Sequence, residues 1–405
     1  MNKRGETNCR ACDRELGPTI LNLGHQPLSN ELISQPKNGD IEAWPLEFKI
    51  CSFCKLGQIG EFATPSRIFS TYTYFSSTST HWLAHSEEFA KKIIEKMDLN
   101  RKSLVLEIAS NDGYMLQYFQ KFGIGVLGIE PAKNVAEIAI NKGIPTDVDF
   151  FGYEKANELI ENGNVPNLVI CNNVVAHVPD INDFFKGLAT LVNQGSIVSI
   201  EAPSLLEMLK GNMFDTIYHE HFSYLSVNAI QYLCDEYEIS LQEVEKIPTH
   251  GGSIRYWLSK KNSKDIKVES ASKELSIGIN DKDLHEQFRI KSERAILEFK
   301  NWINHNRGSV LGFGAAAKAT VLLNAAQIDS NDMQYVIDSN AYKQGKFIPG
   351  CNIEIVKPII GYNSNPKKII VFPWNIANEV SKQIHDEYPK FQGEIWKAIP
   401  TMTQI

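Results

Sequence analysis

The stretch YHEHFSYLS, from Tyr218 to Ser226, gathers ionisable and hydrogen-bonding side chains in one short span. Histidine titrates near neutral pH, so it is well suited to act as a general base. On a regular strand His219 and His221 would share one face, so a contact between Glu220 and His221 requires an irregular loop. Ser226 has the residue type of a helix N-cap, which predicts that a helix follows. The stretch is either a catalytic loop or a polar loop tied to the surface of its domain.

Two C-x-x-C pairs near the N-terminus, Cys9 with Cys12 and Cys51 with Cys54, could ligate a metal ion. The two-residue gap lets both thiolates of one turn reach the same ion, and four thiolates complete the tetrahedral shell of a structural zinc. The pairs are further apart than in a compact zinc ribbon, so unligated thiols or one redox-active pair are the alternatives. A reducing compartment favours zinc, because disulfides are rare there.

Polar side chains follow three predicted strands in the middle of the chain. A carboxylate after the second strand suits the ribose diol of either NAD or S-adenosylmethionine (SAM). The first loop, EIASNDG, has one glycine and two acids instead of the G-x-G-x-x-G that a pyrophosphate needs, which favours SAM. Asn111 and Asp112 could also only cap the next helix. In strand order, the polar residues are Glu107, Asn111, Asp112 and Gly113, then Glu130, then Asn172, Asn173 and His177.

The elements that must position these groups alternate between strands and helices. SLVLEIASNDGYMLQYF reads as a buried strand at 104–108, a loop and a helix, and further strands end near Glu130 and Asn172. A helix is expected from Ser79, with Trp82 and Phe89 on its apolar face. Such alternation predicts a doubly wound parallel sheet of the α/β class, in which ligands bind beyond the carboxyl ends of the strands.

A second strand–turn–helix unit, SVLGFGAAAKATVLL, stands near the C-terminus. Gly312 and Gly314 keep side chains out of the turn, and Lys318 adds a cation near the helix N-terminus, where anions are favoured. G-x-G followed by Asp338 after the next strand could form an NAD site. The rival function is therefore an NAD-dependent sugar-nucleotide oxidoreductase that uses this C-terminal fold. A glycine turn used only for packing is the other alternative.

The whole chain, at 405 residues, predicts two or three domains. Its 43% hydrophobic and 22% charged residues are ordinary for a globular protein, and a net charge of -7 argues against nucleic acid as a partner. MNKRGETNCRACD lacks the apolar core of a signal peptide, and no apolar run approaches the roughly 18 residues of a membrane span. We therefore expect a cytoplasmic protein without a membrane partner.

The ordered motifs EIASNDGYML, GIEP, NNVVAHVPD, YHEHFSYLS and HGGSIR, behind two C-x-x-C pairs, resemble the nucleotide-sugar C-3 methyltransferases of deoxysugar biosynthesis. The resemblance covers nearly the whole chain. It implies a zinc-binding domain at 1–75, a SAM-binding, Rossmann-like methyltransferase domain at 76–262, and a helical connector with a second Rossmann-like domain for the substrate at 263–405. The implied substrate is a dTDP- or GDP-linked 4-keto-deoxysugar, and the oligomeric state stays open.

The resemblance also implies roles for single residues. Methylation at C-3 needs a base, because the C-3 hydrogen is acidic only through the enolate that the C-4 ketone can form. A binding module with a vestigial methyltransferase fold would need no base. The implied catalytic residues are His221 as the base, with Tyr218, Glu220 and His177 beside it, and Tyr74 or its neighbour Tyr72 near the sugar. The implied SAM contacts are Glu107, Asn111, Gly113, Glu130 and Asn173, and the implied substrate contacts are Tyr224, His250, Gly314, Lys318 and Lys343.

Overall fold

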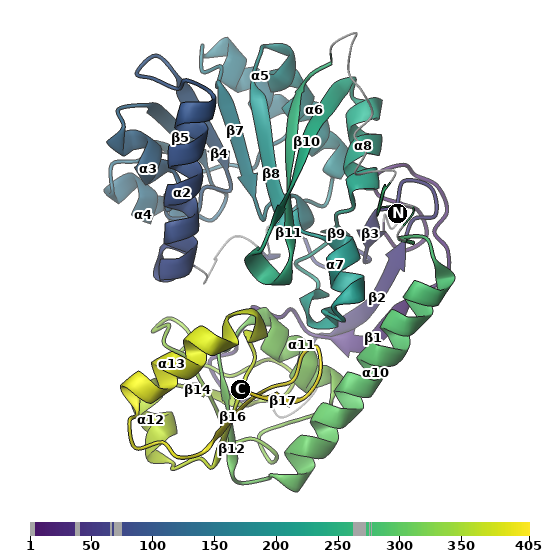
Figure 1. Ribbon diagram of the computed structural model, residues 1–405, viewed down its shortest axis with the longest axis vertical. Coiled ribbons are helices and arrows are strands. Elements are labelled where there is room, and N and C mark those ends of the chain that lie inside the picture. The colour runs from purple at the N-terminus through teal and green to yellow at the C-terminus, as the bar shows by residue number, and fades with distance from the viewer. Residues whose placement is uncertain are drawn as a thin grey trace.

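The computed structural model describes residues 5–36, 41–64, 67–68, 75–261, 273–274, 276 and 278–405. The chain forms a small N-terminal sheet, a large middle α/β unit and a second α/β unit at the C-terminus (Figure 1). The predicted fold class is confirmed. The domain boundaries stay a prediction. Among the described residues, no helix is long and apolar enough to cross a membrane.

The N-terminal sheet has the strand order β1-β2-β3-β9. Along its second strand Leu46, Phe48 and Ile50 are buried, which is the period-two pattern of a half-buried strand. The fourth strand comes from far along the chain, directly after YHEHF, and pairs with the third. The N-terminal sheet therefore holds the segment that carries His221. Its strands are β1 (Leu21–Gln26), β2 (Trp44–Ile50), β3 (Gly57–Gln58) and β9 (Ser223–Tyr224).

The middle unit is a seven-stranded sheet in the order β10-β11-β8-β7-β4-β5-β6, in which β11 alone runs against the others. Its strands are β4 (Leu104–Ile108), β5 (Gly125–Ile129), β6 (Thr146–Asp147), β7 (Leu168–Asn172), β8 (Ile197–Pro203), β10 (Ile239–Ile247) and β11 (Ser253–Lys260). Its α-helices are α2 (Thr80–Lys96), α3 (Leu116–Lys121), α4 (Lys133–Asn141), α5 (Tyr153–Glu161), α6 (Ile181–Asn193), α7 (Leu205–Lys210) and α8 (Val227–Glu236). Short 3-10 turns are η1 (Ser76–Thr78), η2 (Val175–His177), η3 (Phe214–Thr216) and η4 (Thr249–Gly251).

Helices cover both faces of this sheet, and the apolar strands reflect it. Val169 and Cys171 of β7 join the core on one face, and Leu168 and Ile170 join the core on the other. A continuous apolar strand is what a parallel sheet buried on both faces requires. The chain runs from β4 outward to β5 and β6, then returns to β7 on the other side of β4. This reversal creates a crevice at the carboxyl ends of β4 and β7, where ligands bind in such sheets.

The C-terminal unit follows the long helix α10 (Lys282–His305), which runs past the N-terminal sheet to the second α/β unit (Figure 1). Its six-stranded sheet has the order β14-β13-β12-β15-β16-β17, so the strand order reverses at β12. The elements are β12 (Val310–Phe313), α11 (Ala317–Ala325), β13 (Tyr335–Ile337), β14 (Glu354–Val356), α12 (Pro358–Asn363), β15 (Lys368–Val371), η5 (Trp374–Ile376), α13 (Ala377–Glu387), β16 (Glu394–Lys397) and β17 (Thr403–Gln404).

One hydrophobic core joins the three units. It contains Phe48 from β2, Phe214 from η3, Phe288 from α10 and Leu322 from α11. A backbone bridge between Ile33 and Phe347 adds a contact between the first unit and the third. The segment between α7 and α8, which includes YHEHFSYLS, therefore lies where all three units meet.

Candidate active site

The carboxyl ends of β4, β5 and β7 bring the predicted cofactor residues together. Glu107 of β4 pairs in register with Gly128 of β5 and Ile170 of β7. Glu130 follows β5 directly. Its Oε2 accepts the Asn111 backbone N–H at 2.9 Å, and its Oε1 accepts the Ala132 backbone N–H at 2.8 Å. Main-chain N–H groups thus hold the Glu130 carboxylate at this end of the sheet, near the place where the strand order reverses.

Burial controls the charge of the two acids at this end of the sheet. It raises the pKa of Glu130 to about 7, against the opposing effect of the Ala132 and Asn111 N–H groups. It raises the pKa of Glu107 well above its ordinary value, and the Tyr114 hydroxyl opposes that rise. A cationic ligand would favour the ionised forms of both carboxyls. The crevice therefore suits a ligand with positive charge.

Several buried polar atoms at this crevice have no hydrogen-bond partner among the described residues. The Tyr114 hydroxyl lies near Glu107 and Asn172 and lowers the pKa of Glu107. Unsatisfied buried groups are rare, and a polar ligand would satisfy these. The sequence analysis named Asn172 among the polar residues at the strand ends but not among the SAM contacts, and it gave Tyr114 no role, although both stand in motifs that carry the resemblance. The atoms are Oε1 and Oε2 of Glu107, Oγ of Ser110, Oδ1 of Asp112, and Oδ1 and Nδ2 of Asn172.

The backbone around the crevice is strained. Ala109, Asn111 and Asn173 have positive φ angles of 53°, 49° and 54°. Asparagine tolerates this left-handed region, but alanine rarely enters it, and such residues cluster at functional sites. Gly113, with φ 77°, lies so close to Ile144 that an added Cβ would collide with that side chain. The loop after β4 therefore approaches the segment after α4 more closely than a side chain would permit.

The turn η1 lies over this loop. The Ser76 backbone N–H donates to Oδ1 of Asn111 at 2.9 Å, and the Ser77 hydroxyl donates to Asp112. Phe75, just before η1, packs against Tyr342 of the C-terminal unit with 5.1 Å between ring centroids. Tyr74 and the alternative Tyr72 lie outside the described residues, so their role stays a prediction.

The YHEHFSYLS stretch forms an irregular turn that ends at α8, as predicted. The Tyr218 hydroxyl lies 2.7 Å from Nε2 of His221, and the two ring centroids are 3.9 Å apart. The His177 ring, from η2, lies 4.7 Å from the His221 ring. Ser226 caps α8, because its Oγ accepts the Ala229 backbone N–H at 2.9 Å. Residues from two separate loops thus form one cluster.

The partners of the two histidines define which nitrogen carries the proton. Nδ1 of His221 lies 2.9 Å from the Thr216 carbonyl oxygen, and Nδ1 of His177 lies 2.7 Å from the Glu220 carbonyl oxygen. A carbonyl only accepts, so each Nδ1 carries hydrogen and each neutral ring has its lone pair on Nε2. Burial lowers the pKa of His177 to about 4, so that ring is neutral at pH 7. Nε2 of His221 therefore accepts the Tyr218 hydroxyl hydrogen.

Glu220 and His219 face the N-terminal unit. Oε1 of Glu220 accepts the Asn30 backbone N–H at 2.9 Å, and burial raises the pKa of Glu220 to about 7. Nε2 of His219 lies 3.2 Å from the Pro45 carbonyl oxygen, and its ring packs edge-on against Trp44 at 6.0 Å. The two histidines of HEH therefore have different surroundings, and His221 is the one beside Tyr218 and His177.

The C-terminal unit approaches this cluster through Lys318 and Trp374, at the carboxyl ends of β12 and β15. Nζ of Lys318 lies 4.2 Å from the Trp374 ring centroid and donates to Oδ1 of Asn375 at 3.2 Å. Trp374 Nε1–H donates to Oδ2 of Asp215 at 2.7 Å. Asp215 precedes Thr216, whose carbonyl holds His221. Burial raises the pKa of Asp215 to about 6, and the positive charge of Lys318 opposes that rise.

Other predicted substrate residues lie at the same carboxyl ends of the C-terminal sheet. Nζ of Lys343 donates to the Ala315 carbonyl oxygen at 2.8 Å and lies 3.6 Å from Oδ2 of Asp338. Gly314, with φ 87°, leaves no room for a side chain, since an added Cβ would lie 2.5 Å from Cδ of Pro373. Strands β12 and β13 thus place Gly314, Lys318 and Lys343 at the carboxyl ends of the strands of this sheet.

Tyr224 and His250 complete the predicted substrate set. The Tyr224 hydroxyl donates to the Thr216 carbonyl oxygen at 3.4 Å, and its ring lies 6.1 Å from that of His221. The His250 backbone lies in η4, and its side chain lies outside the described part of the structure. Gly251, next to it, approaches Trp374 so closely that an added Cβ would lie 2.8 Å from that ring.

The four cysteines of the C-x-x-C pairs meet at one point. Their Sγ atoms all lie within 4.8 Å of one another, with 3.4 Å between Cys9 and Cys54 and 3.5 Å between Cys12 and Cys51. A tetrahedral zinc with bonds of about 2.3 Å needs sulfur–sulfur distances of about 3.8 Å. The cluster fits zinc, and four protein ligands leave no open position, as in structural sites.

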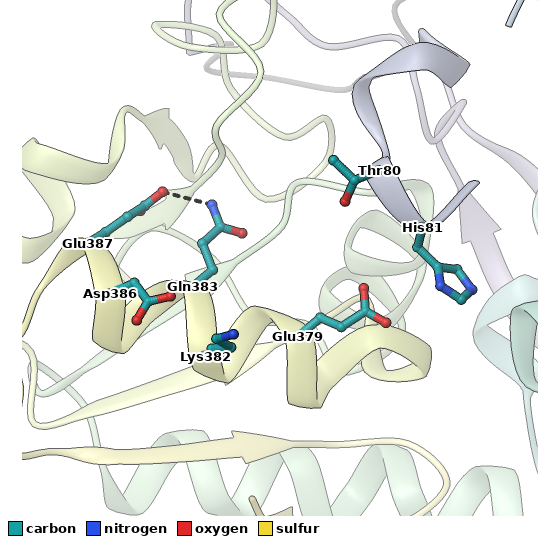
Figure 2. Close-up of a pocket in the computed structure, with 7 residues that line it drawn as sticks. All are labelled: Thr80, His81, Glu379, Lys382, Gln383, Asp386 and Glu387. Atoms are coloured by element: carbon teal, nitrogen blue, oxygen red, sulfur yellow. Dashed lines mark hydrogen bonds between the residues drawn. The ribbon is translucent and has the colours of Figure 1, made fainter. Parts of the chain in front are cut away.

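A separate groove of about 680 Å³ lies between the start of α2 and α13 (Figure 2). Three carboxylates and one lysine line it, so its charge opposes a diphosphate. None of the predicted site residues that the structure describes lines this groove, and we assign no substrate to it. The lining residues are Thr80, His81, Glu379, Lys382, Gln383, Asp386 and Glu387.

A doubly wound sheet with buried acids at its switch point, next to a histidine pair, fits a SAM-dependent methyltransferase. Three family models match consecutive parts of the chain: a putative zinc binding domain at 9–69, a methyltransferase domain at 82–244 and a C-methyltransferase C-terminal domain at 248–400. The chain is a SAM-dependent C-methyltransferase with an N-terminal zinc-binding domain, as the resemblance implied. SAM and zinc are its cofactors.

Individual proteins are similar to this chain. The C-methyltransferase NovU of Streptomyces niveus is 29% identical over 380 residues, which cover 92% of this chain and 90% of NovU. The PH0226 protein of Pyrococcus horikoshii covers 49% of this chain and 100% of its own, with 14% identity and a TM-score of 0.36. Magnesium protoporphyrin IX methyltransferase of Synechocystis, crystallised with SAM, covers 44% of this chain and 79% of its own, with 12% identity and a TM-score of 0.33. Because these TM-scores are low, the classification depends on the sequence matches.

Proposed function

We propose that this C-methyltransferase acts at C-3 of a nucleotide-linked 4-keto-deoxysugar and yields a 3-C-methyl branched sugar. The observation that carries the proposal is the Tyr218–His221 contact at 2.7 Å, with the His177 ring beside it. A carbon next to a ketone becomes a nucleophile only when a base removes its proton. A methyltransferase with a histidine whose Nδ1 is held by a carbonyl and whose Nε2 faces Tyr218 is equipped for that step. The cytoplasm, where thiolates stay reduced, is the compartment we propose.

The proton of C-3 moves to Nε2 of His221, directly or through the Tyr218 hydroxyl that already contacts Nε2. In the second route the hydroxyl passes its own proton to Nε2 while its oxygen takes the proton from C-3. The Thr216 carbonyl accepts the Nδ1 hydrogen at 2.9 Å and stabilises the imidazolium that forms. SAM, when bound, would supply the methyl group to C-3, and S-adenosylhomocysteine would be the second product.

The sheet end of the middle unit would hold SAM. We assign the ribose hydroxyls to Glu130 and the cationic amino group to the acids that include Glu107, because their buried oxygen atoms suit those partners. Asn111, Gly113 and Asn173 shape the same crevice with left-handed backbone.

The carboxyl ends of β12 and β15, in the C-terminal unit, would hold the nucleotide. Lys318 and Lys343 supply two amino groups for a diphosphate. Burial lowers the pKa of Lys318 and the Asp215 carboxylate opposes that change, while Lys343 lies 3.6 Å from Oδ2 of Asp338. A bound diphosphate would favour the charged form of Lys318. Because η3 joins Asp215 to the Thr216 carbonyl that holds His221, a sugar attached to this nucleotide would lie near the base. The match of a C-methyltransferase C-terminal domain model to the domain with the G-x-G turn argues against the NAD-dependent alternative.

The test is methyl transfer from SAM with a ¹³C-labelled methyl group to dTDP- and GDP-linked 4-keto-6-deoxyhexoses, followed by NMR. We expect the label on C-3, with a through-bond correlation to the C-4 carbonyl. The matched 4-hydroxy sugar nucleotide should receive no methyl group, because it cannot form the enolate. Labelling of an oxygen, equal labelling of the 4-hydroxy sugar, or no transfer to either ketone while SAM binds would contradict the proposal.

A further inference from the structure

We infer that Arg10, which lies between the zinc ligands Cys9 and Cys12, is a positioning residue that fixes His177 and His221 relative to each other. The inference rests on the proposed function of this histidine pair. Arg10 is 1% exposed, so its guanidinium is fully enclosed by the protein. Its two terminal nitrogens contact two segments that are far apart in the sequence. One segment follows His177, and the other is hydrogen-bonded to the residue that follows His221.

The first nitrogen holds the His177 loop. Nη1 of Arg10 donates to the Pro179 carbonyl oxygen at 2.8 Å, two residues after His177. From the other side, Nδ2 of Asn182 donates to the carbonyl oxygens of Arg10 and Ala11 at 2.9 and 3.1 Å. The Cys9–Cys12 turn and the segment from His177 to the start of α6 are therefore bonded in both directions.

The second nitrogen holds the segment after His221. Nη2 of Arg10 donates to the Ile59 carbonyl oxygen at 2.8 Å. The Ile59 backbone N–H donates to the Phe222 carbonyl oxygen at 3.3 Å, and the guanidinium carbon lies 5.3 Å from the centroid of the Phe222 ring. Phe222 directly follows His221. One guanidinium thus contacts both the segment after His177 and the residues packed around Phe222, next to His221.

The second zinc turn completes the arrangement. Oγ of Ser226, the N-cap of α8, donates to the Lys55 carbonyl oxygen at 2.9 Å, directly after Cys54. The side chain of Gln58 links the two halves, because Oε1 accepts the Arg10 N–H at 2.9 Å and Nε2 donates to Sγ of Cys9 at 3.3 Å. Zinc at the four thiolates would join the turn beside His177 to the turn beside His221.

Only arginine suits this task. A guanidinium presents donors in a planar, rigid fork, so it can hold two carbonyls at a fixed separation. A lysine at the same place keeps the charge but is a single point donor. Enclosing a charge is costly unless hydrogen bonds compensate. The carbonyls of Pro179 and Ile59 supply hydrogen bonds at the two terminal nitrogens, and the Glu61 carboxylate, 3.9 Å from Nη1, balances the charge.

The experiment compares Arg10→Lys with Arg14→Lys in the full-length zinc-loaded enzyme. Arg14 belongs to the same zinc turn, is exposed, and stacks over Phe53 at 3.3 Å. The two changes are identical in chemistry, but only Arg10 touches the histidine loops. The readouts are zinc content, the dissociation constant of SAM, kcat and KM with the 4-keto sugar nucleotide, and ¹³Cε1 histidine NMR.

For Arg10→Lys we expect kcat to fall about 10- to 100-fold, since a displacement of about 1 Å at a reacting group costs this much. Zinc content and SAM affinity should stay at wild-type values. The NMR signals of His177 and His221 should move, while those of the exposed His25 and His305 should not. Arg14→Lys should match the wild type in every readout. Unmoved histidine signals with wild-type kcat in Arg10→Lys, or an equal loss in Arg14→Lys, would overturn the inference.

A second variant tests the inference in case Arg10→Lys does not fold. Asn182→Ala removes the opposite tether and leaves Arg10 intact, so it should shift the same two histidine signals and lower kcat by a smaller factor. If Asn182→Ala leaves both signals unmoved, the inference fails. His221→Asn separates this result from the proposed function. Full turnover in His221→Asn would refute the base assignment, and the NMR signals would still test the positioning.

Discussion

The Tyr218 hydroxyl lies 2.7 Å from Nε2 of His221, while Nδ1 of the same ring lies 2.9 Å from the Thr216 carbonyl oxygen. The two contacts hold the ring in one tautomer and direct its basic lone pair at Tyr218. His219, two residues earlier, instead directs Nε2 at the Pro45 carbonyl oxygen, 3.2 Å away in the N-terminal unit. This difference between two neighbouring histidines leads to the first prediction.

His221→Asn keeps polarity but loses the basic nitrogen. Methyl transfer should fall by about 10²–10⁴-fold, which is the usual contribution of a positioned acid–base group. SAM affinity, measured by calorimetry, should stay unchanged because the residue is not part of the SAM crevice. His219→Asn is the matched control and should retain turnover. Loss of turnover in His219→Asn with activity retained in His221→Asn would mean that the other histidine is the base.

Glu130→Ala removes the acceptor proposed for the ribose hydroxyls. Charge-assisted hydrogen bonds of this kind contribute about 1.5–3 kcal/mol, so the SAM dissociation constant should rise by about one to two powers of ten. Calorimetry measures it directly, with Glu137→Ala on the exposed face of α4 as the control. Unchanged SAM affinity in Glu130→Ala would contradict the assignment, and tight NADH binding without SAM binding would favour the oxidoreductase alternative.

SAM affinity should also depend on pH through Glu130. Burial raises the pKa of this carboxyl to about 7, so below pH 7 it is protonated and cannot act as a charged acceptor. Affinity should therefore rise about tenfold from pH 6 to pH 8, because the ionised fraction of a carboxyl with a pKa of about 7 rises about tenfold over that interval. In Glu130→Gln the SAM affinity should lose this part of its pH dependence and keep only the part that comes from the titration of SAM itself. Identical pH profiles for wild type and Glu130→Gln would be the contrary result.

Glu220 should make the protein less stable as pH rises. Burial raises its pKa from 4.5 to about 7 in the folded state, so between these values the folded form holds a proton that the unfolded form has released. The resulting loss of stability is fully developed above pH 7 and amounts to about 3 kcal/mol. Urea unfolding between pH 5 and 7.5 measures it. Glu220→Gln should show a shallower decline than the wild type, and parallel curves would refute the prediction.

The cysteine cluster should hold one zinc ion per chain. Four thiolates with no open position define a structural site, and zinc binding is coupled to folding. Metal analysis of protein purified without added zinc gives the stoichiometry, and a chelator should lower the melting temperature. Cys54→Ser should lose zinc, whereas Cys351→Ser, in the core of the C-terminal unit, should keep it. A stoichiometry near zero, with four titratable thiols in the N-terminal unit, would show that the cluster binds no metal.

The sequence by itself determined the local elements and the types of chemistry. The apolar run at 104–108 is the strand β4, and Ser226 caps α8, because strand periodicity and capping depend on neighbouring residues. The same holds for each C-x-x-C turn, whose spacing brings two thiolates together without help from the rest of the chain. These features are properties of a few consecutive residues, so the sequence alone expresses them.

Only the tertiary structure decided which histidine of HEH lies beside Tyr218, and which distant loops meet there. His219 turns to Pro45 because β9 joins the N-terminal sheet, a pairing between residues about 165 positions apart that no local pattern encodes. Arg10 looks like an ordinary surface arginine between two cysteines until Pro179 and Ile59 enclose it. Contacts of this kind depend on how separate segments pack, and the free energy of that packing belongs to the whole fold rather than to any one stretch of sequence.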